Sequence, residues 1–148
     1  MTHRILQIVD RVAALHSADT ARVFKNRRQS LSEKEQELPA TSIDIGEDTA
    51  LDDDGASNFS FLDSIATIAV THRAKADNEE ALLAELIRLR TETHVALMAD
   101  RSLGLAFVID TRYAGAQEPA IDEPNDAIAG SLTSIWRVHY RMNITDPA

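Results

Sequence analysis

The chain lacks cysteine altogether, so it can form neither a disulfide nor a zinc site held by sulfur. Its five glycines are scattered singly, and no phosphate-binding loop or dinucleotide-binding fingerprint can be written from them. No stretch approaches the roughly 20 apolar residues that a membrane-spanning helix needs. The N-terminal residues also lack an apolar run followed by a small-residue cleavage site. We therefore expect a soluble protein that is not exported and has no membrane partner.

The composition is that of an ordinary globular protein. The chain has 148 residues, of which 44% are hydrophobic and 26% charged, and this length suits a single domain. The net charge is −9, whereas binding to nucleic acid is driven by basic residues that displace counterions from phosphates. The charge thus argues against a general nucleic-acid coat, and we expect no specific nucleic-acid recognition.

Metal binding has little support in the sequence. The five histidines, at positions 3, 16, 72, 94 and 139, form no helical pair four residues apart. The run Asp52-Asp53-Asp54 lacks the alternating acids and distal glutamate of a calcium-binding loop, so a solvated loop is the better interpretation. We expect no metal and no cofactor.

Catalysis has equally little support. A Gly-x-Ser-x-Gly turn is absent, and Glu85 and Glu92 alternate with Arg88 and Arg90 as on a solvated helix face. A metal-dependent nuclease would need converging acids and a lysine, but no expected strand offers an acid followed two residues later by lysine. We expect a protein that is not an enzyme, with the nuclease as the less favoured alternative.

Two helices are expected from apolar residues at helical spacing. The first covers residues 3–17, and the second begins with Asp77 and Glu80 in a capping-box-like arrangement. The second helix has a long core-facing stripe, made by Leu82, Leu86, Leu89 and Thr93.

Strands are expected between and after the helices. Residues 59–71 have apolar side chains at both odd and even positions, which indicates a central strand covered on both faces. The other expected strands are 38–45, ended by Gly46, then 105–111 and 131–142, with a short strand starting at 23–25. The order predicts an α+β fold: a mixed, mainly antiparallel sheet with two main helices packed on it, in a single domain. Mobile loops are expected near 26–37, 46–58 and 114–129.

Charge is distributed unevenly along the chain. Residues 1–38 contain seven basic and five acidic residues, whereas residues 39–58 contain six acids and no base. A basic edge and an acidic edge let a subunit join head to tail with copies of itself, and such a contact can close into a ring. Two ordinary flexible loops would explain the same pattern equally well. The candidate contact residues are Lys25, Arg27, Arg28, Lys34, Glu47, Asp48, Asp52, Asp53 and Asp54.

The closing strand alternates cleanly between apolar and polar residues. Leu132, Trp136, Val138 and Tyr140 share one face, which predicts a half-buried strand. The opposite face has three basic or titratable side chains, and we regard them as a weaker candidate contact surface: Arg137, His139 and Arg141.

Three short motifs occupy characteristic places in this order of elements. They are Leu38-Pro39-Ala40 at a strand start, Asp100-x-x-Leu103-Gly104-Leu105-Ala106 after the long helix, and Trp136-x-Val138-x-Tyr140 in the closing strand. With the N-terminal helix and the acid-rich loop, the chain resembles, over nearly its whole length, the tail terminator proteins of long-tailed bacteriophages, of the minor tail protein U type. Many relatives have a second glycine where Leu105 stands here.

The resemblance implies a structural role. Members of the family form a hexameric ring at the head-proximal end of the tail tube, stop further addition of tube protein and offer a surface to the head. The implied partners are copies of the chain, the tail tube protein and the head-tail connector protein. The implied location is the virion tail, after assembly in the host cytoplasm. A neck or head-completion protein that contacts the connector is an alternative of the same class.

Overall fold

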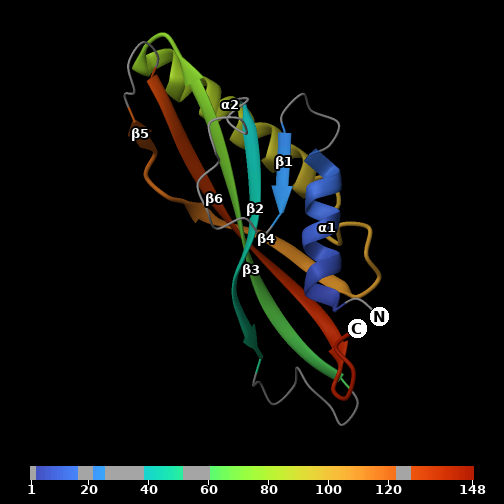
Figure 1. The fold of residues 1–148 in the computed structure, drawn as a ribbon. Coiled ribbons are helices and arrows are strands. Elements are labelled where there is room, and N and C mark those ends of the chain that lie inside the picture. The colour runs from blue at the N-terminus through green and yellow to red at the C-terminus, as the bar shows by residue number, and fades with distance from the viewer. Residues whose placement is uncertain (1–2, 17–21, 26–38, 52–60, 123–127) are drawn as a thin grey trace.

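The fold is α+β, with two helices packed on a mixed, mainly antiparallel sheet in one domain, as the sequence predicts (Figure 1). The computed structural model describes residues 3–16, 22–25, 39–51, 61–122 and 128–148. In chain order the elements are α1 (Arg4–His16), β1 (Arg22–Lys25), β2 (Ala40–Ala50), β3 (Phe61–Ala76), α2 (Glu79–Met98), β4 (Val108–Ala116), β5 (Ala120–Asp122) and β6 (Ile128–Asn143).

The two longest strands, β3 and β6, form the middle of the sheet. The strand order is β1-β2-β3-β6-β4, and β5 pairs with β6 beside β4. Among the described strands, only β1 is parallel to its neighbour, and the other pairs are antiparallel. The ladder between β3 and β6 pairs Phe61 with Asn143 at one end and Ala76 with Ile128 at the other. The expected central strand is therefore confirmed as central.

Both helices pack on the same face of the sheet. Directly paired residues of an antiparallel ladder point to the same side, and the even-numbered residues of β3 and β6 are paired with one another. These even-numbered residues are buried against the helices, as Ile68 and Trp136 are against α1 and Leu132 is against α2. The odd-numbered Ile65 and Ala69 are only half-buried. In the described part of the chain, helices thus cover one face, and the expected cover on both faces is not found there.

The long helix α2 has the predicted core-facing stripe. Its buried side chains are Leu82, Leu86, Leu89, Thr93 and Leu97. The predicted start of the helix is wrong by one residue, because Asn78 is the N-cap and its side chain accepts a hydrogen bond from the Ala81 amide at 2.8 Å. A short side-chain amide can cap as an aspartate does, so the sequence alone did not distinguish the two neighbours.

Strand β2 does not end at Gly46. It runs on to Ala50 with a register shift between Ile45 and Asp48, so residues 46–50 of the expected mobile loop belong to the sheet. A Cβ on Gly46 would lie 3.3 Å from Thr67, so here glycine permits close approach of two strands at a bulge. The rest of that expected loop, 52–58, lies outside the described residues, as does 26–37.

The expected loop 114–129 is also largely strand in its described residues. Residues 114–116 end β4, residues 120–122 form β5 and residues 128–129 open β6, while 123–127 lie outside the described residues. Strand β4 begins three residues later than expected, at Val108. A turn precedes it, in which Leu103 and Gly104 both have positive φ, 56° and 69°.

That turn, which follows α2 in the chain, also contacts α1. The Asp100 carboxylate accepts hydrogen bonds from the Ser102 amide at 3.0 Å and the Ser102 hydroxyl at 2.6 Å. Leu103 is buried in the core, and its carbonyl accepts a hydrogen bond from Arg11 Nε at 2.8 Å. The motif that supported the resemblance is thus a turn that holds one core leucine and one contact to α1.

Candidate interaction surface

The uncovered face of the sheet contains a buried acid, Asp63, that is held by an arginine and a histidine. Asp63 pairs with Arg141 across the β3–β6 ladder and accepts hydrogen bonds from its Nε at 2.7 Å and its Nη2 at 3.2 Å. His139 Nε2 lies 3.2 Å from the same carboxylate. The hydrogen bond from Arg141 lowers the pKa of Asp63 despite the opposing effect of burial, and His139 lowers it further. Two of the predicted contact residues therefore hold a buried acid within the molecule.

A second acid on this face lies on the edge strand β4. Asp110 accepts hydrogen bonds from Arg101 Nη2 at 2.8 Å and Arg112 Nε at 3.0 Å. Arg112 is paired in register with Arg137 of β6, and both arginines are exposed. A hollow of about 220 Å³ opens between them, lined by Ile65, Asp110, Arg112, Arg137 and His139. Like charges directly opposite each other on neighbouring strands repel, so this edge favours an anionic group from outside.

The two predicted acidic contact residues that the structure describes, Glu47 and Asp48, lie in β2, on the opposite side of the central strands from β4. Glu47 is exposed within the bulge, where its carboxylate accepts a hydrogen bond from the Thr49 hydroxyl at 3.2 Å. Asp44, which faces the uncovered side, has one buried carboxylate oxygen, Oδ1, with no hydrogen-bond partner among the described residues. The β2 side of the sheet is therefore acidic.

Asp48, although predicted as a contact residue, is engaged within the molecule. It accepts hydrogen bonds from the Tyr140 hydroxyl at 3.0 Å and the Ser64 hydroxyl at 2.9 Å. Burial and, after it, the hydrogen bond to Asp48 raise the pKa of Tyr140 to about 12. Asp48 thus accepts the hydrogen bond that the hydroxyl of the buried Tyr140 needs.

The predicted basic segment is described only at its first residue. Lys25 ends β1, and its ammonium donates a hydrogen bond to Asp10 of α1 at 2.7 Å. It lies beside the acidic strand β2, with which β1 pairs. Arg27, Arg28, Lys34, Asp52, Asp53 and Asp54 lie outside the described residues.

Two of the five histidines form a buried chain that joins the helices to the sheet. Thr93 Oγ1 lies 2.7 Å from His16 Nε2 and 2.9 Å from His72 Nε2, and the other nitrogen of His72 is 3.0 Å from Thr41 Oγ1. His16 Nδ1 can only donate to the Val12 carbonyl, so a single direction of donors satisfies the chain with both rings neutral. Burial, followed by the nearby His16, lowers the pKa of His72 to about 4. The geometry is that of a packed core, not of a metal site.

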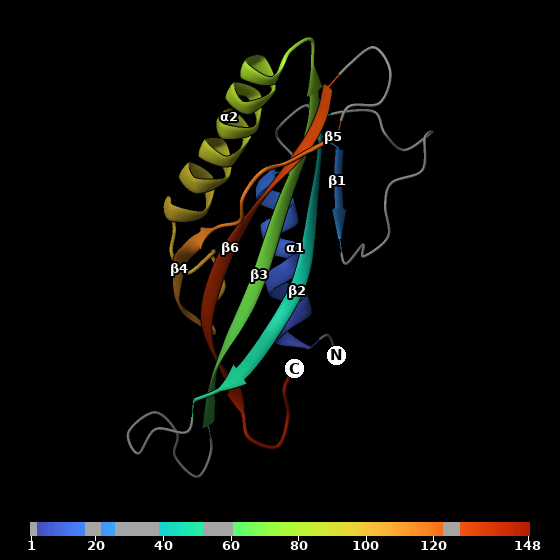
Figure 2. The same ribbon diagram turned by 90° about the vertical axis from the view of Figure 1, so that its left-hand side faces the viewer.

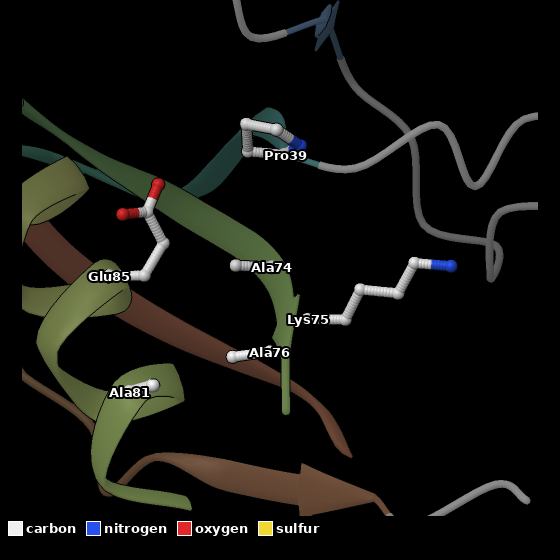
Figure 3. A pocket seen from close by; sticks show the side chains of 6 residues that line it. All are labelled: Pro39, Ala74, Lys75, Ala76, Ala81 and Glu85. Atoms are coloured by element: carbon white, nitrogen blue, oxygen red, sulfur yellow. The ribbon is translucent and has the colours of Figure 1, made fainter. Parts of the chain in front are cut away.

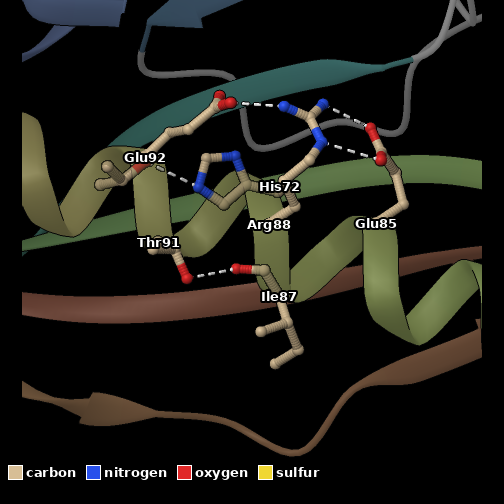
Figure 4. A network of polar contacts seen from close by, with 7 residues as sticks. His72, Glu85, Ile87, Arg88, Thr91 and Glu92 are labelled. Carbon is tan, nitrogen blue, oxygen red and sulfur yellow. Dashed lines mark hydrogen bonds and ion pairs between the residues drawn. The ribbon is translucent and has the colours of Figure 1, made fainter.

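The outer face of α2 has ion pairs between residues of the helix itself. Arg88 forms ion pairs with Glu85, at 2.6 Å, and with Glu92, and Figure 4 shows this network above His72. Two apolar side chains of α2, Ile87 and Val95, are also exposed. This arrangement matches the solvated helix face that the sequence predicted.

A shallow hollow of about 250 Å³ lies near the N-terminal end of α2, between Pro39, Ala74, Lys75, Ala76, Ala81 and Glu85 (Figure 3). Its lining contains one acid and one base, and the Lys75 side chain points away from Glu85. It brings together no nucleophile with a base.

The described residues do not bring together the side chains that a nuclease or a metal site would need. Asp44 is paired with Ala69, six positions from Asp63 along β3, which at 3.3 Å per residue separates the two acids by about 20 Å. Within the described ranges, no group of three or more metal-ligating side chains comes together. No described helix is long and apolar enough to cross a membrane.

Sequence reasoning missed three residues of this surface: Asp63 as a structural partner, Asp110 and Arg112. One signal was available, because Asp63 is the lone charged residue between positions 59 and 71. A charge in such a run predicts a paired acid. Its partner could not be found without the register between β3 and β6.

Comparison with known proteins adds no family. No family model matches the chain, and no curated protein matches it.

Proposed function

We propose that the protein is a structural subunit that forms a ring with copies of itself and terminates the tail tube of a long-tailed bacteriophage. In this proposal the ring stops addition of tube protein, offers the surface for joining to the head connector, and carries out no reaction. The proposal begins from the resemblance in motifs and element order.

The observation that carries it is the uncovered face of the sheet. On this face Asp63 and Asp110 are each paired with an arginine, and Arg112 lies opposite Arg137. Among the described residues, Asp44 lies apart from these acids, so they do not converge on one point. Surfaces of this kind suit recognition of another protein, because charged side chains at fixed positions on strands set the register and orientation of a partner.

The three motifs on which the resemblance is based also have packing roles that suit a rigid subunit. Trp136 and Tyr140 fill the core under α1, and Leu103 fixes the turn after α2. Pro39 immediately precedes β2, where its missing amide hydrogen is tolerated. A subunit built in this way holds its edges at fixed spacing, which a closed ring requires.

Polymerisation of the tail tube protein from the same virus tests the proposal. Added to growing tubes, the protein should shorten them and leave a ring-shaped density at one end in electron micrographs. Tube protein from an unrelated phage serves as the control and should be unaffected. Tubes of unchanged length with bare ends would contradict the proposal, and binding to the connector protein alone would favour the head-completion alternative.

A further inference from the structure

The two long edges of the sheet carry opposite charge. Strand β4 forms one edge, and β2 forms the other beyond Ile43, because β1 pairs only with residues 40–43. Figure 2 shows β4 and β2 on opposite sides of the central β6 and β3. In the described part of the chain, neither β4 nor the stretch of β2 from Asp44 to Ala50 has a strand on its outer side.

The β2 edge is acidic. Asp44, Glu47 and Asp48 lie in this stretch, and there is no lysine or arginine from residue 39 to residue 58. Asp48 is engaged by Tyr140, but the Asp44 carboxylate accepts only a 3.4 Å bond from Ser42 and keeps a buried oxygen without a described partner. No arginine or lysine forms an ion pair with Asp44 in the described residues, so a cation that approached this face would be attracted to its carboxylate.

The β4 edge is basic. Arg101, Arg112 and Arg137 surround a single acid, Asp110, which Arg101 and Arg112 already share. Arg137 is exposed and forms no hydrogen bond or ion pair with any residue that the structure describes, although it is paired in register with Arg112. The three arginines therefore have one carboxylate among them, which leaves a net positive charge at this edge.

These unsatisfied groups lie on the same side of the sheet. Asp44 pairs with Ala69, which pairs with Ile135, and Arg137 lies two residues further along the same strand. Residues two apart on a strand share a face, so Asp44 and Arg137 both project from the uncovered face. If two copies lie edge to edge with their sheets continuous, the acidic group of one meets the basic group of the other on that face.

We propose that the β4 edge of one copy binds the β2 edge of a second copy, with Arg112 and Arg137 meeting Asp44 and Glu47. The contact joins different surfaces on the two copies, so it propagates and can close into a ring. Register shifts interrupt β4 between Val108 and Asp110 and β2 after Ile45, so ion pairs carry the contact and backbone pairing is short.

This inference deepens the proposed function, on which it rests in taking a second copy as the partner. It takes Arg112 and Arg137 as the basic partner of the acidic edge in place of Lys25, which belongs to β1 on the same side as β2 and is paired with Asp10. Arg27, Arg28 and Lys34 lie outside the described residues.

Two charge reversals, Arg137→Glu and Glu47→Lys, test the contact by sedimentation velocity over a range of protein concentrations. The unmodified protein should associate. Each variant alone places like charges at the contact and should associate about tenfold more weakly. An equimolar mixture of the two variants can alternate and should recover much of the lost association, because the carboxylate introduced in one variant then meets the ammonium introduced in the other. Recovery in the mixture cannot come from a variant that fails to fold.

The control reversals are Lys75→Glu and Glu118→Lys, which change the net charge equally at exposed positions outside the two sets of contact residues. They should leave association unchanged. Unmodified protein that stays monomeric, variants that associate like it, or a mixture no better than its components would each overturn the edge contact. If the edge contact holds but the oligomer does not cap tubes, the proposed function fails while the contact stands.

Discussion

Asp63 and Arg141 lie directly across the central β3–β6 ladder, and the arginine Nε donates to the carboxylate at 2.7 Å. The Asp63 side chain is only 4% exposed, although no helix covers this face in the described residues. A shift of the ladder by one residue would move the acid to the apolar face. The pair therefore fixes the register of the two longest strands.

Asp63→Asn should destabilise the protein by about 1–2 kcal/mol, because the amide keeps the shape but loses the charge-assisted hydrogen bonds. The loss is modest because Arg141 is half exposed and solvent screens its charge. Urea denaturation at neutral pH measures the change. Asp10→Asn, which removes an exposed pair with Lys25, is the control and should stay within about 0.5 kcal/mol. Equal losses in the two variants would mean that burial of Asp63 contributes nothing.

Stability should fall as the pH is lowered from about 6.5 to about 4, owing to His72. Its ordinary pKa is 6.5 and its folded pKa is about 4, so the unfolded chain binds the extra proton throughout this window. The contribution of neutral His72 to the free energy of unfolding is fully present above pH 6.5. About 3 kcal/mol of it is lost by pH 4. The lowered pKa of Asp63 acts in a separate window, because its contribution is present above pH 3.8 and is lost below it.

Urea denaturation of His72→Gln across the same pH range checks this assignment. The variant can be less stable at every pH, since it disturbs the bonds to Thr93 and Thr41, but its stability should depend less on pH between 6.5 and 4. His94→Gln, at an exposed position on α2, should keep the full dependence. The explanation is wrong if His72→Gln and the unmodified protein lose stability in parallel.

The parts of this fold that the sequence predicted are those set by local periodicity. The stripe Leu82, Leu86 and Leu89 and the alternation that buries Trp136 and Val138 follow from 3.6- and two-residue repeats within one element. Both repeats are readable without knowing what lies opposite, and they identified α2 and β6 correctly.

The parts that the sequence did not predict depend on partners far along the chain. A glycine after a strand pattern can end the strand or permit a close approach between strands, and at Gly46 only the nearness of Thr67 shows that it does the second. Arg112 and Arg137 are far from the acids of β2 in sequence, and only the strand order shows that Arg112 lies on the opposite edge strand, β4, with Arg137 beside it on β6. Sheet order and register are long-range properties, so charge clusters in a sequence do not reveal which edge they occupy.

Gly130→Ala should be among the costliest small substitutions in the sheet. A Cβ at this position would lie 2.8 Å from the Ala120 carbonyl oxygen and 3.0 Å from Leu82 Cδ2, so the backbone of β5 must move and the Leu82 side chain must give way. Overpacking of this kind costs about 1–3 kcal/mol. Gly46→Ala is the matched control, because its nearest atoms belong to Thr67 at 3.3 Å and a small shift accommodates the methyl group. Urea denaturation that ranks Gly46→Ala as the more damaging change would contradict this account.

Self-association should weaken with salt if the sheet edges meet through Arg112, Arg137, Asp44 and Glu47. Raising the ionic strength from about 0.1 M to 1 M shortens the screening length from about 10 Å to about 3 Å, which removes most attraction between exposed charges. The arginines and Glu47 are exposed, so the contact begins with solvated charges, and sedimentation velocity should show dissociation as salt rises. The exposed Ile109 on β4 offers a competing apolar explanation of any association. Apolar contacts are not screened and strengthen in sulfate, so association that persists or grows in high salt would assign the interface to Ile109 and its neighbours instead.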